Sequence, residues 1–377
     1  MAFFETFGKL VQDLKLKKRL FKKRIFKGKS RKKFYQINPT ENFEIPKSLE
    51  CTFPLRSSNE YKSEVEKHCL EWAMQFGLVT KEEAIKRFKS AKYGLFGCYV
   101  YPNAPFDRLC LVTDFMIWLF LLDDQIDNKH DLIDKPEKLK RILDGFLLVI
   151  DSDHCPDSAK CPIAVALWDL WSKMKCITGK AWQQRFRTSL ANYFSSYYTH
   201  SQNCVSKKAH KSIDDYVELR RNTGAVQVTF NFVEITLNIE LPDDVYSDPN
   251  FQCLMNYCND HACFINDIYS LRKELLVNDT DNLIFVLKNL SNYSLQEAVN
   301  DAVKLSNLRV TQIRENISKL PDFGPEMNKT VKMYFEGLED WLAGSFYWHQ
   351  ISGRYAVEDN ATRKYMESYL EPILTHN

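Results

Sequence analysis

Along most of the chain after residue 60, apolar residues recur every three or four positions, which is the period of an amphipathic helix. Ser294 and Glu297 have the spacing of a capping box and mark the start of one such segment. No alternating pattern typical of strands and no internal repeat is found. The sequence therefore predicts an all-α fold, with helices over 60–76, 81–91, 107–127, 136–150, 164–177, 180–200, 213–238, 250–277, 294–320 and 326–352.

The composition supports long helices around a large core. Of the 377 residues, 45% are hydrophobic, and Gly and Pro number only 12 and 13. The longest apolar run, 109–122, is interrupted by Thr113 and Asp114. It is too short for a membrane span and predicts a buried core helix. We expect one α domain over residues 41–377.

The first 40 residues differ sharply in charge from the rest. Residues 1–34 carry 13 Lys/Arg and two acids, a balance of +11 in a chain of net charge +2, so the remainder carries −9. We predict a basic, flexible N-terminal arm over residues 1–40. The composition favours a solvated tail. Peripheral contact with an anionic membrane surface is the next interpretation. Nucleic-acid binding ranks third, and a nucleic-acid partner is not expected.

The cysteines indicate a reducing compartment. Eleven are present, with no CxxC pair, and the first residues lack the pattern of a secretory signal. The sequence therefore predicts a cytoplasmic protein with free thiols.

The first candidate site is LLDDQID, at the end of the most apolar predicted helix. Asp123 and Asp127 are four residues apart, so their carboxylates share a helix face about 6 Å apart along the axis. With Asp124 between them, they suit a hard divalent cation that prefers oxygen ligands. The same pattern also occurs on solvated helix ends, and by itself it is a weak signal.

The second candidate site is INDIYSLRKE, residues 265–274. Asn266, Ser270 and Glu274 lie at four-residue spacing, so an amide, a hydroxyl and a carboxylate project from one face among apolar neighbours. Lys273 lies beside them and could reach an anion held by a metal. An ordinary polar helix face is the alternative, but such a stripe needs polar partners when buried.

Two further motifs carry arginines. In LRRNTGAVQ, Arg220 lies four residues before Gly224, which can mark a helix break or a simple kink. In WHQISGRYAV, Arg354 and Tyr355 follow an aromatic helix, and the planar guanidinium of arginine suits phosphate oxygens.

Together, the four motifs resemble those of the class I terpene cyclases of microbial type. DDxxD and NDxxSxxKE occur there on a single α domain. The resemblance covers about residues 60–360 and includes the run YVYPNAP at 99–105. Its style is most similar to the octocoral terpene cyclases. It implies a class I terpene synthase α-domain helical bundle around a central apolar cavity.

The resemblance also implies a role for each motif residue. Asp123 and Asp127 would bind two Mg²⁺ ions with Asp124 in support, and Asn266, Ser270 and Glu274 would bind a third, with Mn²⁺ as an alternative cation. Thr223 would be the linker and Gly224 the effector at the helix break. Thr223 departs from the many bacterial members that carry an acid there. The residues implied to hold the diphosphate are Arg220, Lys273, Arg354 and Tyr355.

The implied reaction is ionisation of a prenyl diphosphate followed by cyclisation of the carbocation. A dry aromatic cavity would protect that cation. The candidate lining residues, each of which could equally be core packing, are Phe115, Phe120, Phe230 and Trp348. No general base is evident, and the released diphosphate could accept the final proton. Geranylgeranyl diphosphate is the favoured substrate and farnesyl diphosphate follows closely.

Two alternatives remain open. A chain-elongating isoprenyl diphosphate synthase would carry a second DDxxD, where this chain has Asn, Ser and Glu. A non-catalytic helical binding protein with a basic arm would leave the polar stripe around Asn266 unexplained. The DxDD motif of protonation-initiated cyclases is absent. The sequence does not decide between a monomer and a homodimer.

Overall fold

The computed structural model describes residues 38, 41–56, 60–127, 130–152, 154–155, 161–277, 280–356 and 373–374. The predicted arm therefore lies outside the described residues, apart from Asn38. The chain divides into two units, 1–36 and 37–377, and the following account concerns the second. Its described residues form helices and no strands, which confirms the predicted fold class.

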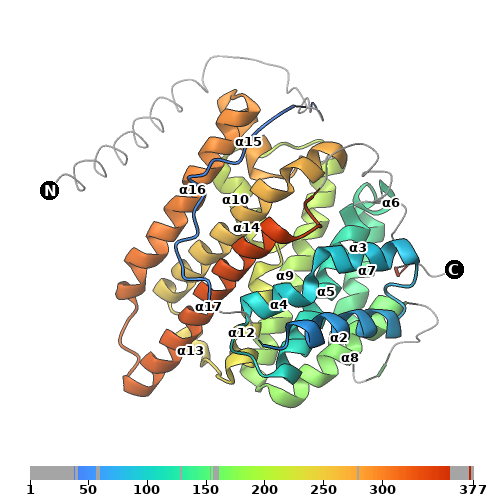
Figure 1. Cartoon of the computed structure of the whole chain (residues 1–377), viewed down its shortest axis with the longest axis vertical. Coiled ribbons are helices and arrows are strands. Elements are labelled where there is room, and N and C mark those ends of the chain that lie inside the picture. Colours follow the sequence, from blue (N-terminus) through green and yellow to red (C-terminus); the bar gives the residue numbers. More distant parts are fainter. Residues whose placement is uncertain are drawn as a thin grey trace. The chain divides into compact units, whose positions relative to one another are not determined.

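Helices follow one another in sequence through the described part of this unit, joined by short connections (Figure 1). Their bounds are α2 Lys62–Gln75, α3 Glu82–Ala91, α4 Tyr93–Val100, α5 Phe106–Asp127, α6 His130–Ile133, α7 Pro136–Asp151, α8 Pro162–Ile177, α9 Lys180–Val205, α10 Ile213–Thr223, α11 Val226–Phe230, α12 Phe232–Leu237, α13 Asp243–Tyr246, α14 Pro249–Val277, α15 Leu283–Ser291, α16 Leu295–Asn316, the 3₁₀ turn η1 Ile317–Lys319 and α17 Pro325–Ile351.

Helix α5 forms the centre of the core. No side chain from Arg108 to Ile126 is exposed, as expected for a helix that is apolar on all sides. Helices α2, α4, α8 and α12 pack around it. This burial fixes where the acidic end of α5 emerges, and so positions the first motif.

Four helices lie outside the predicted ranges, namely α4, α6, α13 and α15, and glycine explains why α4 was missed. Helix α4 contains Gly94 and Gly97, and glycine is unfavourable inside a helix. In the structure, a Cβ on Gly94 would lie 2.7 Å from the Glu66 backbone, and one on Gly97 would lie 2.0 Å from Thr113 Oγ1. The glycines therefore allow α4 to pack closely against α2 and α5. Helix α15 begins with a run of five apolar residues, 283–287, which shows no helical period.

The helix predicted over 213–238 is broken into α10, α11 and α12. The first break follows Gly224, whose φ is −71°, and the residue in the left-handed region is Ala225, with φ 54°. A non-glycine residue in this region is uncommon and costs conformational energy. The break faces the site described below.

An extended segment, residues 41–56, runs beside α16 (Figure 1). Gln296 exchanges hydrogen bonds with the Glu44 backbone, and Asn307 Nδ2 donates to the Ser48 carbonyl. These contacts anchor the start of the α domain to its later helices.

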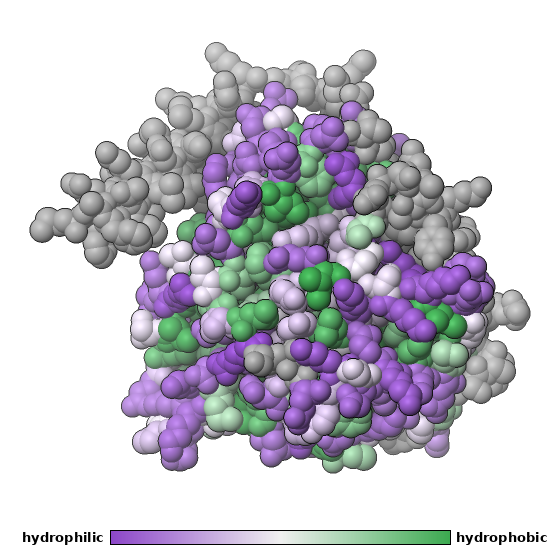
Figure 2. Space-filling view, viewed as in Figure 1, coloured by the Kyte–Doolittle hydropathy of each residue, from purple (hydrophilic) through white to green (hydrophobic). Residues whose placement is uncertain are grey.

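The surface shows separate apolar groups. Figure 2 presents a mostly hydrophilic face, and the exposed large apolar residues come from different elements, for example Met74, Leu148 and Met333. Within the described ranges, every helix is too short or too polar to cross a membrane.

Candidate active site

A cavity of about 160 Å³ lies among α5, α9, α14, α17 and the break between α10 and α11. It collects residues from all four sequence motifs, although these lie far apart in the chain. The predicted site residues that line it are Phe120, Asp123, Arg220, Thr223, Gly224, Asn266, Ser270, Lys273, Glu274, Trp348, Arg354 and Tyr355.

The two adjacent aspartates at the end of α5 have different environments. Asp123 lines the cavity, accepts a hydrogen bond from the Tyr197 hydroxyl and pairs with Arg354 Nη2 at 3.1 Å. Asp124 is 2% exposed, lies 2.7 Å from Arg354 Nη1 and 3.6 Å from Lys273 Nζ, and does not line the cavity. Burial raises the pKa of Asp124, but Arg354 and Lys273 outweigh it and lower the pKa to about 2. Asp124 is therefore held by Arg354 and Lys273, and its supporting role beside a metal stays a prediction.

Asp127 is the last residue of α5, and its side chain lies outside the described residues. Its predicted role as a metal ligand stays a prediction.

The polar stripe on α14 faces the cavity as its spacing predicts. Asn266 Oδ1 accepts a hydrogen bond from Arg220 Nη2 at 2.8 Å, and its Nδ2 donates to the Tyr355 hydroxyl at 3.0 Å. Nδ2 also lies 3.2 Å from His349 Nε2. The Ser270 Oγ is buried with no hydrogen-bond partner among the described residues. A buried hydroxyl without a polar partner is unfavourable unless a bound ligand supplies one.

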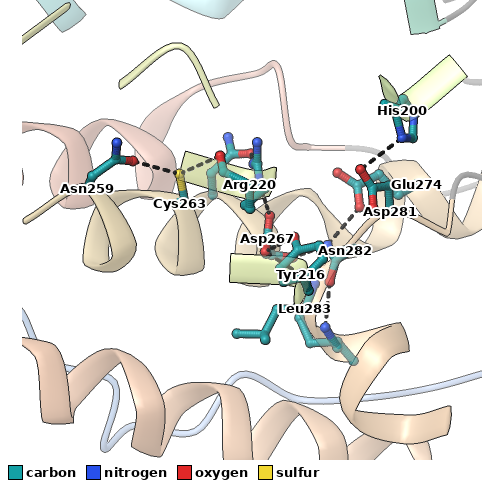
Figure 3. Close-up of polar contacts among 12 residues, drawn as sticks. His200, Tyr216, Arg220, Asn259, Cys263, Asp267, Glu274, Asp281, Asn282 and Leu283 are labelled. Atoms are coloured by element: carbon teal, nitrogen blue, oxygen red, sulfur yellow. Dashed lines mark hydrogen bonds and ion pairs between the residues drawn. The ribbon is translucent and has the colours of Figure 1, made fainter. Parts of the chain in front are cut away.

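Arg220 connects the helix break with the α14 stripe. Its Nε lies 2.9 Å from Asp267 Oδ1 (Figure 3). Burial alone would lower the pKa of Arg220, but the Asp267 charge raises it well above its usual value. A Cβ on Gly224 would lie 3.3 Å from Arg220 Nη1 and 2.6 Å from Cys263 Sγ, so glycine permits this close approach. The Thr223 Oγ1 is buried without a partner in the described part of the chain.

An aromatic wall lines the apolar part of the cavity. The rings of Phe96 and Trp348 stack with centroids 4.3 Å apart, and Phe120 lies 5.5 Å from Trp348. Trp341 extends the wall, 6.0 Å from Phe96. The sequence had singled out Phe120 and Trp348, but Phe96 was missed because it lies on the unpredicted helix α4.

Phe115 and Phe230 were proposed as cavity residues, but neither lines the cavity. Phe115 packs edge-on against Phe186 and Phe232, and Phe230 packs against Trp341. Both rings are fully buried in the core. Helical periodicity identifies a buried side chain, but it does not distinguish a core contact from a cavity wall.

His349 and Tyr197 also line the cavity and were not predicted. His349 follows Trp348 directly, and its ring stacks on Tyr355 with centroids 4.7 Å apart. Burial chiefly lowers the pKa of His349, to about 4, so the ring is neutral at pH 7. His349 lies in the WHQISGRYAV run but was given no role there, and Tyr197 belongs to no motif.

The donors at the cavity suit a hard divalent cation. Among the described residues, no group of three or more His, Cys, Asp or Glu is arranged to hold a metal. The converging donors are instead the carboxylate of Asp123 and the oxygens of Asn266, Ser270 and Glu274. Such oxygen donors are typical of Mg²⁺ sites, and a cation would complete the unpartnered Ser270 Oγ. The residues present therefore fit a divalent metal.

Known proteins share both the fold and the metal-binding region. Residues 114–312 match the family model described as terpene synthase family 2, C-terminal metal binding. The chain is 26% identical over 327 residues to pristinol synthase of Streptomyces pristinaespiralis, covering 84% of this chain and 87% of the relative. It is 29% identical over 316 residues to alpha-muurolene synthase of Coprinopsis cinerea, covering 81% and 72%. Among solved structures, a-eudesmol synthase matches with a TM-score of 0.71 at 22% identity, covering 83% of this chain and 100% of that chain.

The fold and the metal-binding region define a class I terpene synthase, a lyase that acts on prenyl diphosphates. The matched region spans more than half of the sequence, and this chain belongs to terpene synthase family 2.

Proposed function

We propose that this protein ionises a linear prenyl diphosphate of fifteen to twenty carbons and cyclises the resulting carbocation, with Mg²⁺ as cofactor. One observation carries the proposal. Asp123 from α5 and the Asn266, Ser270 and Glu274 stripe from α14 line one cavity, together with Arg220, Lys273 and Arg354. Oxygen donors and cations thus meet at one end of an aromatic pocket.

The metal would be held by the two motifs. Asp123 and Asp127 would bind two ions and Asn266, Ser270 and Glu274 a third. Bound Mg²⁺ neutralises the charge of a diphosphate and makes it a better leaving group. This assignment predicts that Asp123 and Asn266 exchange their present arginine partners for metal contacts.

The cationic residues would bind the diphosphate oxygens. Arg354 is buried at the cavity, Arg220 is partly buried there, and both carry planar donor groups suited to phosphate. Lys273 adds a positive charge beside Glu274, and the Tyr355 hydroxyl adds a further hydrogen-bond donor. These groups stabilise negative charge on the leaving group as the carbon–oxygen bond breaks.

The aromatic rings that line the cavity would stabilise the carbocation. Aromatic faces attract a cation by roughly 0.5–2 kcal/mol each, and the rings also exclude water that would quench it. Phe96, Phe120, Trp341 and Trp348 supply these faces. No residue is assigned as the final base, and the released diphosphate would accept the last proton.

Two lines of support bear on the substrate length. The octocoral-like style of the sequence favours the twenty-carbon geranylgeranyl diphosphate. Two relatives of 28% and 26% identity, T-muurolol synthase of Roseiflexus castenholzii and 4-epi-cubebol synthase of Streptosporangium roseum, are named as cyclising farnesyl diphosphate. A product screen decides between the two lengths.

The test is incubation of the full chain with ten-, fifteen-, twenty- and twenty-five-carbon prenyl diphosphates and Mg²⁺, followed by gas chromatography. Cyclic products from the fifteen- or twenty-carbon substrate are expected, and none with a metal chelator present. Longer prenyl diphosphates as products would favour a chain-elongating synthase. No turnover of any substrate would favour a binding protein.

A further inference from the structure

Asn282 lies directly behind the metal-binding stripe, outside the cavity and outside every sequence motif. It is fully buried and is the N-cap of α15. Its Oδ1 accepts a hydrogen bond from the Ile284 backbone N–H at 2.8 Å. Its Nδ2 donates to Glu274 Oε2 and to the Asp267 carbonyl, both at 2.7 Å (Figure 3).

These contacts fix the amide in one orientation. The acceptor is required by the helix N-terminus, and the two N–H groups face two acceptors, so a flipped amide would break all three contacts. Aspartate in this position would lack the donors and would place a second carboxylate against Glu274. Serine or threonine could still cap the helix, but their shorter side chains would not reach Glu274.

The same helix start also holds the acid that positions Arg220. The Leu283 backbone N–H donates to Asp267 Oδ2 at 3.2 Å, and the Tyr216 hydroxyl donates to the same oxygen at 2.6 Å. The other oxygen of Asp267 pairs with Arg220 Nε. The two residues that begin α15 therefore contact both the carboxylate of Glu274 and the partner of Arg220 (Figure 3).

We propose that Asn282 is a positioning residue that holds the Glu274 carboxylate in the orientation needed to bind Mg²⁺. The proposal rests on the proposed function, because it assigns Glu274 to the metal. Groups that orient a metal ligand typically change metal affinity by about 10–100-fold when they are removed. The next residue, Leu283, contacts the Asp267 carboxylate that pairs with Arg220, so Asn282 also ties the orientation of Glu274 to that of Arg220.

The first experiment compares Asn282→Thr with the unmodified chain. Calorimetry measures the binding of Mg²⁺ in the presence of inorganic pyrophosphate, without any turnover. We expect the affinity of the variant for Mg²⁺ to fall about tenfold or more. Threonine retains the cap, so the loss of thermal stability should be limited to that of the two hydrogen bonds donated by Asn282 Nδ2. Asn282→Ser serves the same purpose if the threonine variant does not fold.

The matched control is Ser294→Ala, which removes the N-cap of α16 away from the site. We expect it to lower thermal stability and to leave Mg²⁺ affinity unchanged. If it weakens Mg²⁺ binding as much as Asn282→Thr, the effect follows from a general loss of stability and the proposal is overturned.

A double-variant cycle tests whether Asn282 acts through Glu274. In a Glu274→Ala background, Asn282→Thr should cause no further loss of affinity, because the carboxylate it orients is gone. Additive losses would overturn the proposal. If the unmodified chain itself fails to bind Mg²⁺ with pyrophosphate, the proposed function fails. If it binds normally and Asn282→Thr binds equally well, only the role of Asn282 fails.

Discussion

At the scale of single residues, two arginines occupy the oxygens expected to bind metal. Arg354 bridges Asp123 and Asp124, and Arg220 pairs with Asn266 and Asp267. Beside Arg354 and Lys273 the pKa of Asp124 falls to about 2, so this buried carboxylate stays charged. Neighbouring residues also differ in role. Asp123 lines the cavity, whereas Asp124 is a buried partner of Arg354 and Lys273.

Asp123→Ala and Asp124→Ala should therefore fail in different ways. Asp123→Ala is expected to abolish product and to change stability little, because its side chain is 32% exposed. Asp124→Ala leaves Arg354 and Lys273 without a buried counter-charge and should lower the free energy of unfolding by roughly 3 kcal/mol. Product analysis and urea unfolding measure the two effects.

The matched control is Asp144→Ala on the exposed side of α7, where the aspartate pairs with Lys140. It should leave both turnover and stability nearly unchanged. Full turnover by Asp123→Ala would count against its role as a ligand, as would full turnover by Asn266→Ala, which is also expected to abolish product.

At the scale of elements, the break between α10 and α11 brings backbone and Arg220 to the cavity. Gly224 allows it because nothing larger fits between Cys263 and Arg220. Ala225 adopts the left-handed conformation that turns the chain. The sequence marked the break through its glycine, but the residue that bends is the alanine that follows.

Gly224→Ala should displace Arg220 or Cys263, because its Cβ would lie 2.6 Å from the Cys263 Sγ. We expect a loss of roughly 1–3 kcal/mol in stability from overpacking, with a marked fall in turnover. The control is Gly145→Ala in α7, where a Cβ meets nothing within 4 Å. That variant should gain up to about 1 kcal/mol from helix propensity and keep full turnover. Normal kinetics in Gly224→Ala would show that the close approach is not required.

At the scale of the whole domain, a largely buried carboxylate joins the segment before α15 to the end of α9 and the segment before α10. Asp281, just before α15, pairs with His200 at the end of α9 and with His210 before α10, at 2.9 and 2.8 Å. Burial lowers the pKa of His200, but Asp281 raises it well above its usual value. Burial raises the pKa of Asp281, but His200 lowers it far below its usual value.

The pair predicts a pH-dependent stability. The contribution of His200 is complete below its unfolded pKa of 6.5 and declines as pH rises toward the raised folded value. The contribution of Asp281 is complete above 3.8 and is lost as pH falls. Asp281→Asn should therefore cost roughly 3 kcal/mol near pH 5.5 and less near pH 8. Urea unfolding at both pH values measures this, and an equal cost at both would contradict the assignment.

The basic arm gives a prediction for the whole chain. Every described residue that lines the cavity comes from Phe96 onward. Deleting residues 1–37 should therefore leave product formation in solution unchanged, and a loss above tenfold would contradict this. Co-sedimentation of the full and shortened chains with anionic vesicles tests the membrane interpretation, since only the full chain would bind.

The sequence by itself determined the class of fold and most of the chemistry. Helical periodicity depends only on local spacing, so it located the long helices and placed Asn266, Ser270 and Glu274 on one face. The residue types in the motifs were enough to indicate oxygen donors for a metal and cations for a diphosphate. These inferences needed no knowledge of which helices pack together.

The tertiary structure alone decided which residues contact one another, and so which role each residue has. Asp123 and Asp124 are chemically identical and both contact Arg354, about 230 positions away in the chain. Only Asp123 lines the cavity, whereas Asp124 is buried beside Lys273. Phe115 and Phe120 both lie on α5. Packing by other helices places Phe115 in the core and Phe120 on the cavity wall. Asn282 belongs to no motif and gains its contacts only when α15 folds against α14. Local spacing fixes the face of a helix, whereas long-range packing decides what that face meets.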